Sequence, residues 1–314
     1  MTRRGRVVQP TAGGPGSVPR ALRVIAALAC LLWCATAVAT PRVVTLDWGI
    51  AQNLIALGVA PIGVGQVAGY RSWVAGPPLP SDTREIGLRS QPNMELLAQL
   101  DPDRIFITEL YAGQAQRLSS IAPVSSVDVY FSDGDVWDNT LAAVTKLGRL
   151  VDRDKAAKAL IARTRRQIAR QADRVPADTR PLLMLQFVDE SHVRVYGSGS
   201  LVVATARRMG LDNAWHGATT RWGMAMVPIS RLADINDARV IVMGPVPVGV
   251  ADKIADNRVW QALPAVRQAP PVFIPAVWSF GGLPSATRFA HLIADALTRA
   301  PDTGPGWPRA RPTP

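Results

Sequence analysis

The stretch Asp154–Val175 reads DKAAKALIARTRRQIARQADRV and contains neither glycine nor proline. It is rich in Ala, Arg, Lys and Leu, and at about 1.5 Å per residue it would form a helix of ~30 Å. Pro176 and Pro181 follow it and stop the helix. Short apolar runs alternate with helical segments before the stretch and again after it. This pattern favours a rigid connector between two lobes, and the alternative is a surface helix of a single domain.

The segments before this helix alternate between strand-like and helix-like patterns. Asn93 is a plausible N-cap, and the proline-rich segment Gly65–Asp82 is expected to be a loop. The expected strands are Val43–Leu46, Pro61–Val64 and Arg104–Thr108, and the expected helices are Ile50–Leu57, Asn93–Leu100 and Gln114–Ser120.

The same alternation follows the helix. The expected strands are Leu182–Val188, Val193–Gly197, Arg239–Met243 and Val272–Ile274, and the expected helices are Leu201–Met209, Pro228–Ile235 and Arg288–Leu297. Alternating strands and helices indicate parallel sheets covered by helices. The predicted fold is therefore α/β, with two α/β lobes that have central sheets and are joined by a long rigid helix. The predicted boundaries are 40–150, 151–175 and 176–300.

The N-terminus resembles an export signal that leads to the periplasm. Arg20 and Arg23 precede the apolar run Val24–Trp33, and Ala37-Val38-Ala39 is a small-x-small cleavage site, so cleavage is expected before Thr40. The segment 1–39 contains both cysteines, so the mature chain has no disulfide or thiolate metal site. Cys34 follows Leu32-Trp33, a poor context for a lipoprotein, and Arg3-Arg4 leaves twin-arginine export as an alternative. The proline-rich tail 301–314 is expected to be disordered.

Composition and motifs argue against nucleic-acid binding and catalysis. The chain has 314 residues, of which 48% are hydrophobic, and a net charge of +11. Without the five arginines of the signal, 30 basic and 24 acidic residues leave +6, with no dense basic run. His192, His216 and His291 lack metal-ligand spacing, and Ser198-Gly199-Ser200 is not a nucleophile elbow. No protein-bound metal, cofactor or enzymatic activity is predicted.

Tryptophan is the prominent feature of the mature chain, which retains eight of the nine. Five of them lie near strand ends or in loops, where open α/β sheets bind ligands. These five are Trp48, Trp73, Trp215, Trp222 and Trp278, and Phe280 lies in the loop of the last. Together they are expected to form an aromatic wall, although each one alone fits buried packing equally well. Arg89 and Tyr111 could donate hydrogen bonds to ligand oxygens within it.

Several segments, in order along the chain, carry a family resemblance. They are Leu46-Asp47-Trp48, Tyr70-Arg71-Ser72-Trp73-Val74, Pro77-Pro78-Leu79-Pro80, Gly87-Leu88-Arg89-Ser90-Gln91-Pro92-Asn93, Phe131-Ser132-Asp133-Gly134, Asn213-Ala214-Trp215 and Pro275-Ala276-Val277-Trp278. From about Arg42 to about Ala300 the chain resembles the periplasmic ferric-hydroxamate siderophore-binding proteins of ABC importers.

The resemblance implies a bilobal fold with a long connecting helix, of the helical-backbone (class III) kind. It also implies that Arg89 and Tyr111 hydrogen-bond the hydroxamate oxygens around iron, and that the five tryptophans line the site. The siderophore holds the iron in this family, so no protein metal ligand or cofactor is expected. The expected partners of this monomer are a ferric siderophore and an inner-membrane permease with its ATPase. Glu95, Glu109 and Asp234 are candidate acids for docking to the permease.

The chain departs from this family at Ile107, Arg221, Met224 and Phe280. Arg221, with Arg71 or Arg288, is hypothesised to favour a siderophore that bears a carboxylate. The alternatives left open are another large chelate, such as haem, a corrinoid or a catecholate complex, and a periplasmic siderophore esterase. The esterase would need a nucleophile–base pair, which the sequence does not display.

Overall fold

The computed structural model describes residues 40–130 and 133–299. The predicted signal peptide, its cleavage site and the C-terminal tail lie outside these residues. Among the described residues, 41–130 and 133–299 belong to one compact unit. Within the described residues, no helix is both long and apolar enough to cross a membrane.

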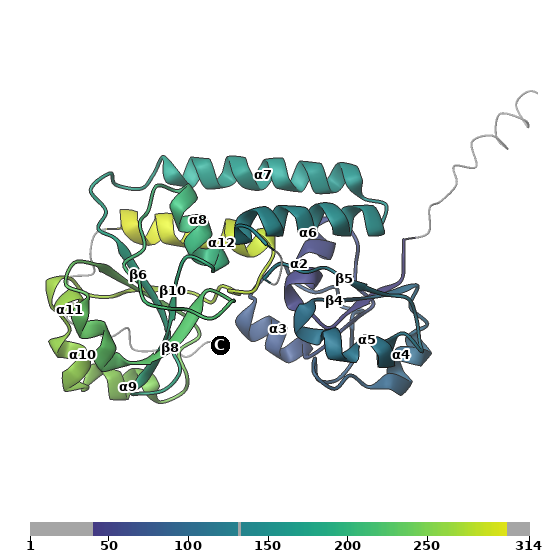
Figure 1. The fold of residues 1–314 in the computed structure, drawn as a ribbon, viewed down its shortest axis with the longest axis horizontal. Helices are drawn as coiled ribbons and strands as arrows, with labels where there is room; N and C mark the ends of the chain where they lie inside the picture. Colours follow the sequence, from purple (N-terminus) through teal and green to yellow (C-terminus); the bar gives the residue numbers. More distant parts are fainter. Residues whose placement is uncertain (1–39, 131–132, 300–314) are drawn as a thin grey trace, which may run out of the picture. The chain divides into compact units, whose positions relative to one another are not determined.

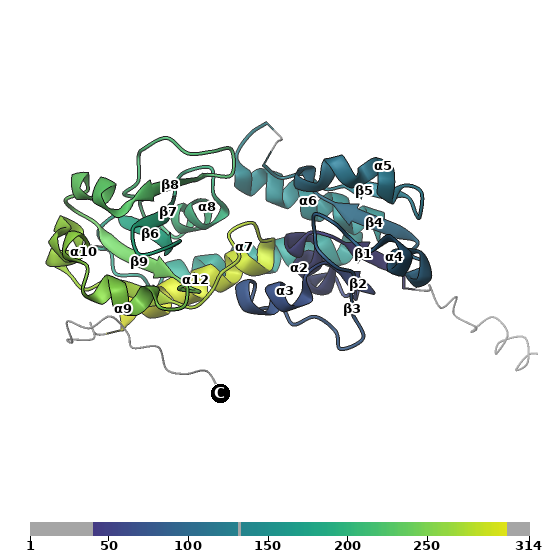
Figure 2. The ribbon, with the colours of Figure 1, turned by 90° about the horizontal axis from the view of Figure 1, so that it is seen from below.

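The first sheet consists of five parallel strands in the order β3-β2-β1-β4-β5 (Figure 2). Its strands are β1 (Val43–Thr45), β2 (Gly63–Val64), β3 (Arg84–Glu85), β4 (Arg104–Ile107) and β5 (Val124–Ser126). The helices between and after them are α2 (Trp48–Ala56), α3 (Val67–Trp73), α4 (Met94–Leu100), α5 (Ala115–Leu118) and α6 (Val136–Leu150), with a 3-10 helix at Glu109–Gln114. Every residue of β1 is buried, as expected for a central parallel strand.

The second sheet has the order β10-β9-β6-β7-β8. Its strands are β6 (Leu182–Phe187), β7 (His192–Tyr196), β8 (Met224–Pro228), β9 (Arg239–Met243) and β10 (Val272–Ile274). Strands β10, β9 and β6 run parallel, whereas β7 and β8 are antiparallel to their neighbours. The helices of this half are α8 (Leu201–Arg208), α9 (Val250–Ala255), α10 (Arg258–Ala262), α11 (Pro264–Gln268) and α12 (Leu283–Thr298), with a 3-10 helix at Ile229–Asp234.

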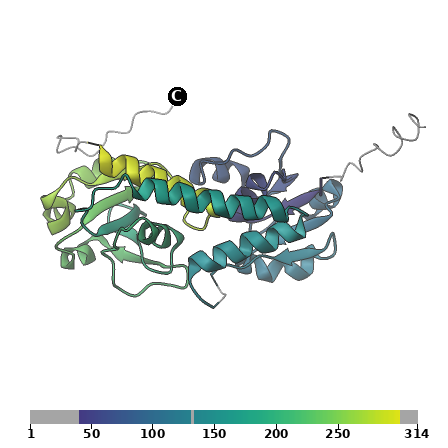
Figure 3. The ribbon, with the colours of Figure 1, turned by 90° about the horizontal axis from the view of Figure 1, so that it is seen from above.

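The long helix α7 (Asp154–Ala172) lies beside α12 and α6, and both neighbours pack against it (Figure 3). Figure 1 shows that α7 extends along both halves of the molecule, from the second sheet to the first. One apolar core continues beneath it, with Val43 and Phe106 from the first sheet and Leu182 and Met184 from the second. The predicted two-lobed α/β fold joined by a long helix is therefore confirmed.

Several predicted segments were wrong in detail. Gly65–Asp82 is not entirely a loop, because α3 lies within it; its N-cap, Gln66, has φ 52° and no capping side-chain bond, so the sequence lacks a start signal. The short helix predicted at Gln114–Ser120 is confirmed as α5 (Ala115–Leu118), and only its first residue, Gln114, belongs to the preceding 3-10 helix. Pro228–Ile235 is a strand end and a 3-10 helix.

Helix α12 also starts earlier than predicted, at Leu283 rather than Arg288, because Pro284 fits its first turn. The predicted cap at Asn93 is confirmed, because its side chain accepts a bond from the N–H of Leu96. Gly210 follows α8 with φ 75°, a left-handed conformation that suits glycine after a helix end.

Gln52 joins α2 to the chain segment that leads into α12. Its side chain is fully buried, donates to the carbonyl of Gly76 (2.6 Å), and accepts from the N–H of Gly282 (3.1 Å) and the hydroxyl of Ser285 (2.8 Å). A Gln52→Leu substitution keeps the volume but leaves these three groups without partners. We expect it to lower the free energy of unfolding by about 3 kcal/mol in urea titrations. Gln116→Leu, at an exposed position of α5, should change it by less than about 0.5 kcal/mol.

Candidate functional site

The order in which strands are added to the first sheet reverses between β1 and β4. The chain places β2 and β3 on one side of β1, and then β4 and β5 on the other side. Ligands of open α/β sheets bind at the carboxyl ends of the strands at such a switch point. Asp47 and Trp48 follow β1, and Thr108, Glu109 and Tyr111 follow β4. The topology therefore brings two of the predicted site residues, Trp48 and Tyr111, to the switch point.

Three aromatic rings and one guanidinium form a contiguous group, which we call the aromatic site: Trp48, Trp278, Phe280 and Arg89. The ring centroids of Trp48 and Trp278 are 4.8 Å apart, and those of Trp278 and Phe280 are 5.3 Å apart. Trp48 is held at the start of α2, where its indole N–H donates to the carbonyl of Gly65 (2.8 Å). The loop after β10 supplies the other two rings, so both sheets contribute to the site.

Arg89 is stacked within this group. Its Cζ lies 3.8 Å from the ring centroid of Trp48 and 5.5 Å from that of Trp278. Its Nε donates to the side-chain oxygen of Gln66 (3.2 Å), which fixes the guanidinium plane. No described residue accepts a bond from its two terminal nitrogens. Arg89 is thus a half-buried cation that retains donors for the oxygens of a ligand.

Tyr111 lies half-buried in the 3-10 helix after β4 and packs against the apolar core of the first sheet. Burial and the charge of Asp47 raise the pKa of its phenol to about 12, while the charge of Arg89 opposes this shift. Tyr111 therefore stays protonated at neutral pH and remains a hydrogen-bond donor.

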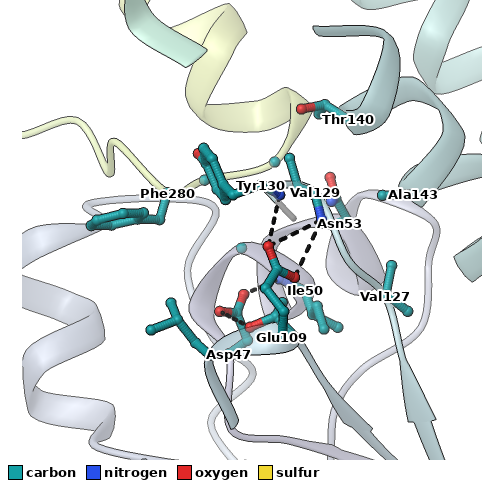
Figure 4. Close-up of a pocket in the computed structure, with 15 residues that line it drawn as sticks. Asp47, Ile50, Asn53, Glu109, Val127, Val129, Tyr130, Thr140, Ala143 and Phe280 are labelled. Carbon is teal, nitrogen blue, oxygen red and sulfur yellow. Dashed lines mark hydrogen bonds between the residues drawn. The ribbon is translucent and has the colours of Figure 1, made fainter. Parts of the chain in front are cut away.

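A small cavity of about 30 Å³ lies beneath Phe280, and the carboxyl groups of Asp47 and Glu109 both point into it (Figure 4). Glu109 accepts bonds from the N–H groups of Val129 (3.3 Å) and Tyr130 (2.7 Å). The hydroxyl of Tyr130 donates in turn to the carbonyl of Ser279 (3.1 Å), beside the aromatic site. Burial raises the pKa of the Glu109 carboxyl above its usual range.

The other residues predicted to bind the ligand are not members of the aromatic site. Trp73, at the end of α3, packs half-buried against the apolar cluster that contains Trp48. Trp215 is 9% exposed and packs into the core of the second sheet, with Gly217 directly against its indole, so it is a packing residue in this structure. Trp222 and the exposed Arg221 occupy the turn before β8.

The charged residues selected from the sequence also lie on different elements and outside the aromatic site. Arg71 is exposed on α3, and Arg288 donates to the carbonyl of Ala276 (2.9 Å). Glu95 is exposed on α4, and Asp234 pairs with Arg231. Glu109 is half-buried and accepts the N–H groups of Val129 and Tyr130, and its role as a docking acid stays a prediction. Residues 40–130 and 133–299 contain no group of three or more His, Cys, Asp or Glu side chains placed to hold a metal.

Sequence reasoning missed the polar support of this site. Asp47, Gln66, Glu109 and Tyr130 hold or flank the aromatic site, but none was assigned to it. A signal existed for Asp47, which follows an apolar strand and precedes a helix, as an N-cap does. The contact between Tyr130 and Ser279 spans 149 residues and has no local sequence signal.

Two α/β lobes joined by a helix, with an aromatic and cationic site at a switch point, define a solute-binding protein. The chain belongs to the family described as "Periplasmic binding protein", whose model matches residues 43–276. The family resemblance stated from the sequence is confirmed. This family consists of binding proteins rather than enzymes, in agreement with the prediction.

The chain is similar to the "Iron(3+)-hydroxamate-binding protein FhuD" of Escherichia coli, with 34% identity over 285 residues that cover 88% of this chain and 96% of that protein. It is 23% identical to the "Fe(3+) dicitrate-binding periplasmic protein FecB" of the same species, over 72% and 74% of the two chains. The crystal structure of FhuD from Vibrio cholerae with bound Fe³⁺–Desferal matches with a TM-score of 0.76 and 25% identity, over 83% of this chain and 98% of that chain.

Proposed function

We propose that the chain is the periplasmic component of an ABC importer and that it binds Fe(III)-hydroxamate siderophores. The observation that carries this proposal is the stacking of Arg89 on Trp48 within the aromatic site, with its terminal donors left for a ligand. A ferric tris-hydroxamate is large, partly apolar and neutral overall, with partial negative charge on its oxygens. Aromatic rings with one cation complement these properties.

In this proposal, Arg89 and Tyr111 donate hydrogen bonds to the oxygens around iron. Trp278 and Phe280 contact the apolar part of the chelate, with Trp73 and Trp222 at its margins, and Trp48, which is 3% exposed, supports Arg89 through the stacking contact. The siderophore supplies every iron ligand, so the protein contributes no metal bond and no cofactor. Similarity to the two relatives from E. coli, whose names describe iron-chelate binding, supports the same class of ligand.

Titration of tryptophan fluorescence tests this function directly, since two indoles lie in the aromatic site. We expect saturable quenching of the mature chain by ferrichrome and ferrioxamine at micromolar or lower concentration. Ferric dicitrate, a ferric tris-catecholate and haemin should bind more weakly, and the iron-free hydroxamates should serve as controls. Absence of any response to the two hydroxamate chelates would contradict the proposal.

A further inference from the structure

A groove of about 500 Å³ lies between α7, α12 and the segment that follows α3, and it shares no lining residue with the aromatic site. Clefts of roughly 300–1,000 Å³ accommodate small-molecule ligands. The hydroxyls of Thr164 and Thr287, which line it, bond to each other across α7 and α12 (3.5 Å). Most of the wall is apolar, with Ile55, Ala56, Pro77, Leu160, Pro284 and Leu292.

The backbone carbonyls of one wall are already satisfied from inside the molecule. The carbonyl of Gly76 accepts a bond from the side chain of Gln52 (2.6 Å), and the carbonyl of Pro77 accepts one from the hydroxyl of Tyr70 (2.6 Å). Both donor residues are buried. The segment after α3 therefore presents the ring of Pro77 to the groove rather than unpaired acceptors.

Among the described residues that line the groove, every ionisable side chain is basic: Arg163 on α7, and Arg288 and His291 on α12. Arg288 is half-buried, and its Nε donates to the carbonyl of Ala276 (2.9 Å), which orients the guanidinium. Within residues 40–130 and 133–299, no side chain pairs with Arg163 or accepts a bond from the terminal nitrogens of Arg288. Two guanidinium groups of the groove thus retain donors.

The single acid of α12 does not neutralise this positive charge. Asp295 lies one helical turn beyond His291, but it pairs with Arg174 (2.6 Å). Burial lowers the pKa of the Arg288 guanidinium, yet an arginine keeps its charge at neutral pH. An anion beside Arg288 would therefore restore interactions that its charge has lost with water.

We propose that this groove binds a small amphipathic carboxylate, with its apolar chain along the walls and its carboxylate held by Arg163 and Arg288. The forked donors of a guanidinium match the two oxygens of a carboxylate. A small polar anion would leave the apolar walls in water, and an uncharged apolar molecule would leave the donors of Arg288 without a partner. This site is additional to the siderophore site of the proposed function.

Decanoate is the probe, and isothermal titration calorimetry below its critical micelle concentration measures its binding to the mature chain. The variants are Arg163→Gln and Arg288→Gln. Arg165→Gln is the matched control, because Arg165 is exposed, lies about 200° around the same helix and does not line the groove. Two further probes test the ligand class: acetate lacks the chain, and decyltrimethylammonium carries the same chain with a cationic head.

We expect saturable binding of decanoate to the wild type, weakened about threefold or more by Arg163→Gln and about tenfold or more by Arg288→Gln. Arg165→Gln should change the dissociation constant by less than about twofold. Acetate should give no measurable binding, and decyltrimethylammonium should bind at least about tenfold more weakly than decanoate. If Arg288→Gln does not fold, Arg163→Glu at its exposed position should weaken decanoate binding more than Arg163→Gln does.

Three outcomes would overturn the inference: no binding of decanoate, equal binding of decyltrimethylammonium, or an affinity for decanoate that the arginine variants of the groove leave unchanged. The aromatic site also combines apolar rings with a cation, so Arg89→Gln serves as a test of location. It should bind decanoate as the wild type does, and a loss there would place decanoate in the aromatic site and overturn the inference. Ferrichrome titration tests the proposed function separately, so either idea can fail without the other.

Discussion

An Arg89→Gln variant should bind ferric hydroxamates at least about 30-fold more weakly than the wild type. The guanidinium is half-buried between two indoles, and its terminal nitrogens are the donors that the proposed ligand requires. Loss of one partner from a desolvated, charge-assisted contact costs about 2–5 kcal/mol. Glutamine retains polarity but supplies neither the charge nor the forked donors. Fluorescence titration with ferrichrome measures the loss.

Arg71→Gln is the matched control for this variant, because Arg71 is exposed on α3. It should bind ferrichrome within about twofold of the wild type. Far-UV circular dichroism and thermal unfolding should be unchanged in both proteins, which separates a binding defect from a folding defect. Wild-type affinity in a folded Arg89→Gln protein would remove Arg89 from the site and weaken the proposed function.

The sequence predicted the fold because its signals are local. The helix near Asp154 has a long run without glycine or proline, and the central strands are short apolar runs. Helix α3 was missed because it has seven residues, lies among prolines and starts after a left-handed residue, Gln66. Strand β3 was missed because it has two residues, both exposed, and thus no apolar pattern.

The site was predictable only in part. Trp48, Trp278, Phe280 and Arg89 lie together because each follows a strand end or its adjoining turn. Trp215 also lies in a loop, yet it packs inward, since an indole fits a wall or a core equally well and only the fold decides. The polar residues behind the aromatic site depend on contacts between distant segments, as in the bond from Thr108 to Asp47.

The turn that carries Trp222 depends on the absence of a side chain at Gly223. Its φ is 66°, and a Cβ there would lie 2.0 Å from the nitrogen of Ser200 and 2.1 Å from the carbonyl carbon of Gly199. The carbonyl of Gly223 also accepts the N–H of Gly197 (2.8 Å), so the turn is tied to the start of α8. Backbone atoms cannot move aside as a flexible side chain can. The turn at Gly223 and the segment Gly199–Ser200 must therefore move apart to admit a Cβ.

We therefore expect Gly223→Ala to lower the free energy of unfolding by about 3 kcal/mol or more in urea titrations. Gly210→Ala is the control, because Gly210 has a similar φ of 75° but no atom within 4 Å of the added Cβ. Gly210→Ala should lower the free energy of unfolding by only about 1–2 kcal/mol, which is the cost of a left-handed conformation for alanine. Equal losses in the two variants would show that the close approach of Gly223 to Ser200 does not constrain the turn. A larger loss of unfolding free energy for Gly223→Ala would show that this close approach constrains the turn. If the folded variant also binds ferrichrome more weakly in the absence of urea, the packing at Gly223 determines the position of Trp222.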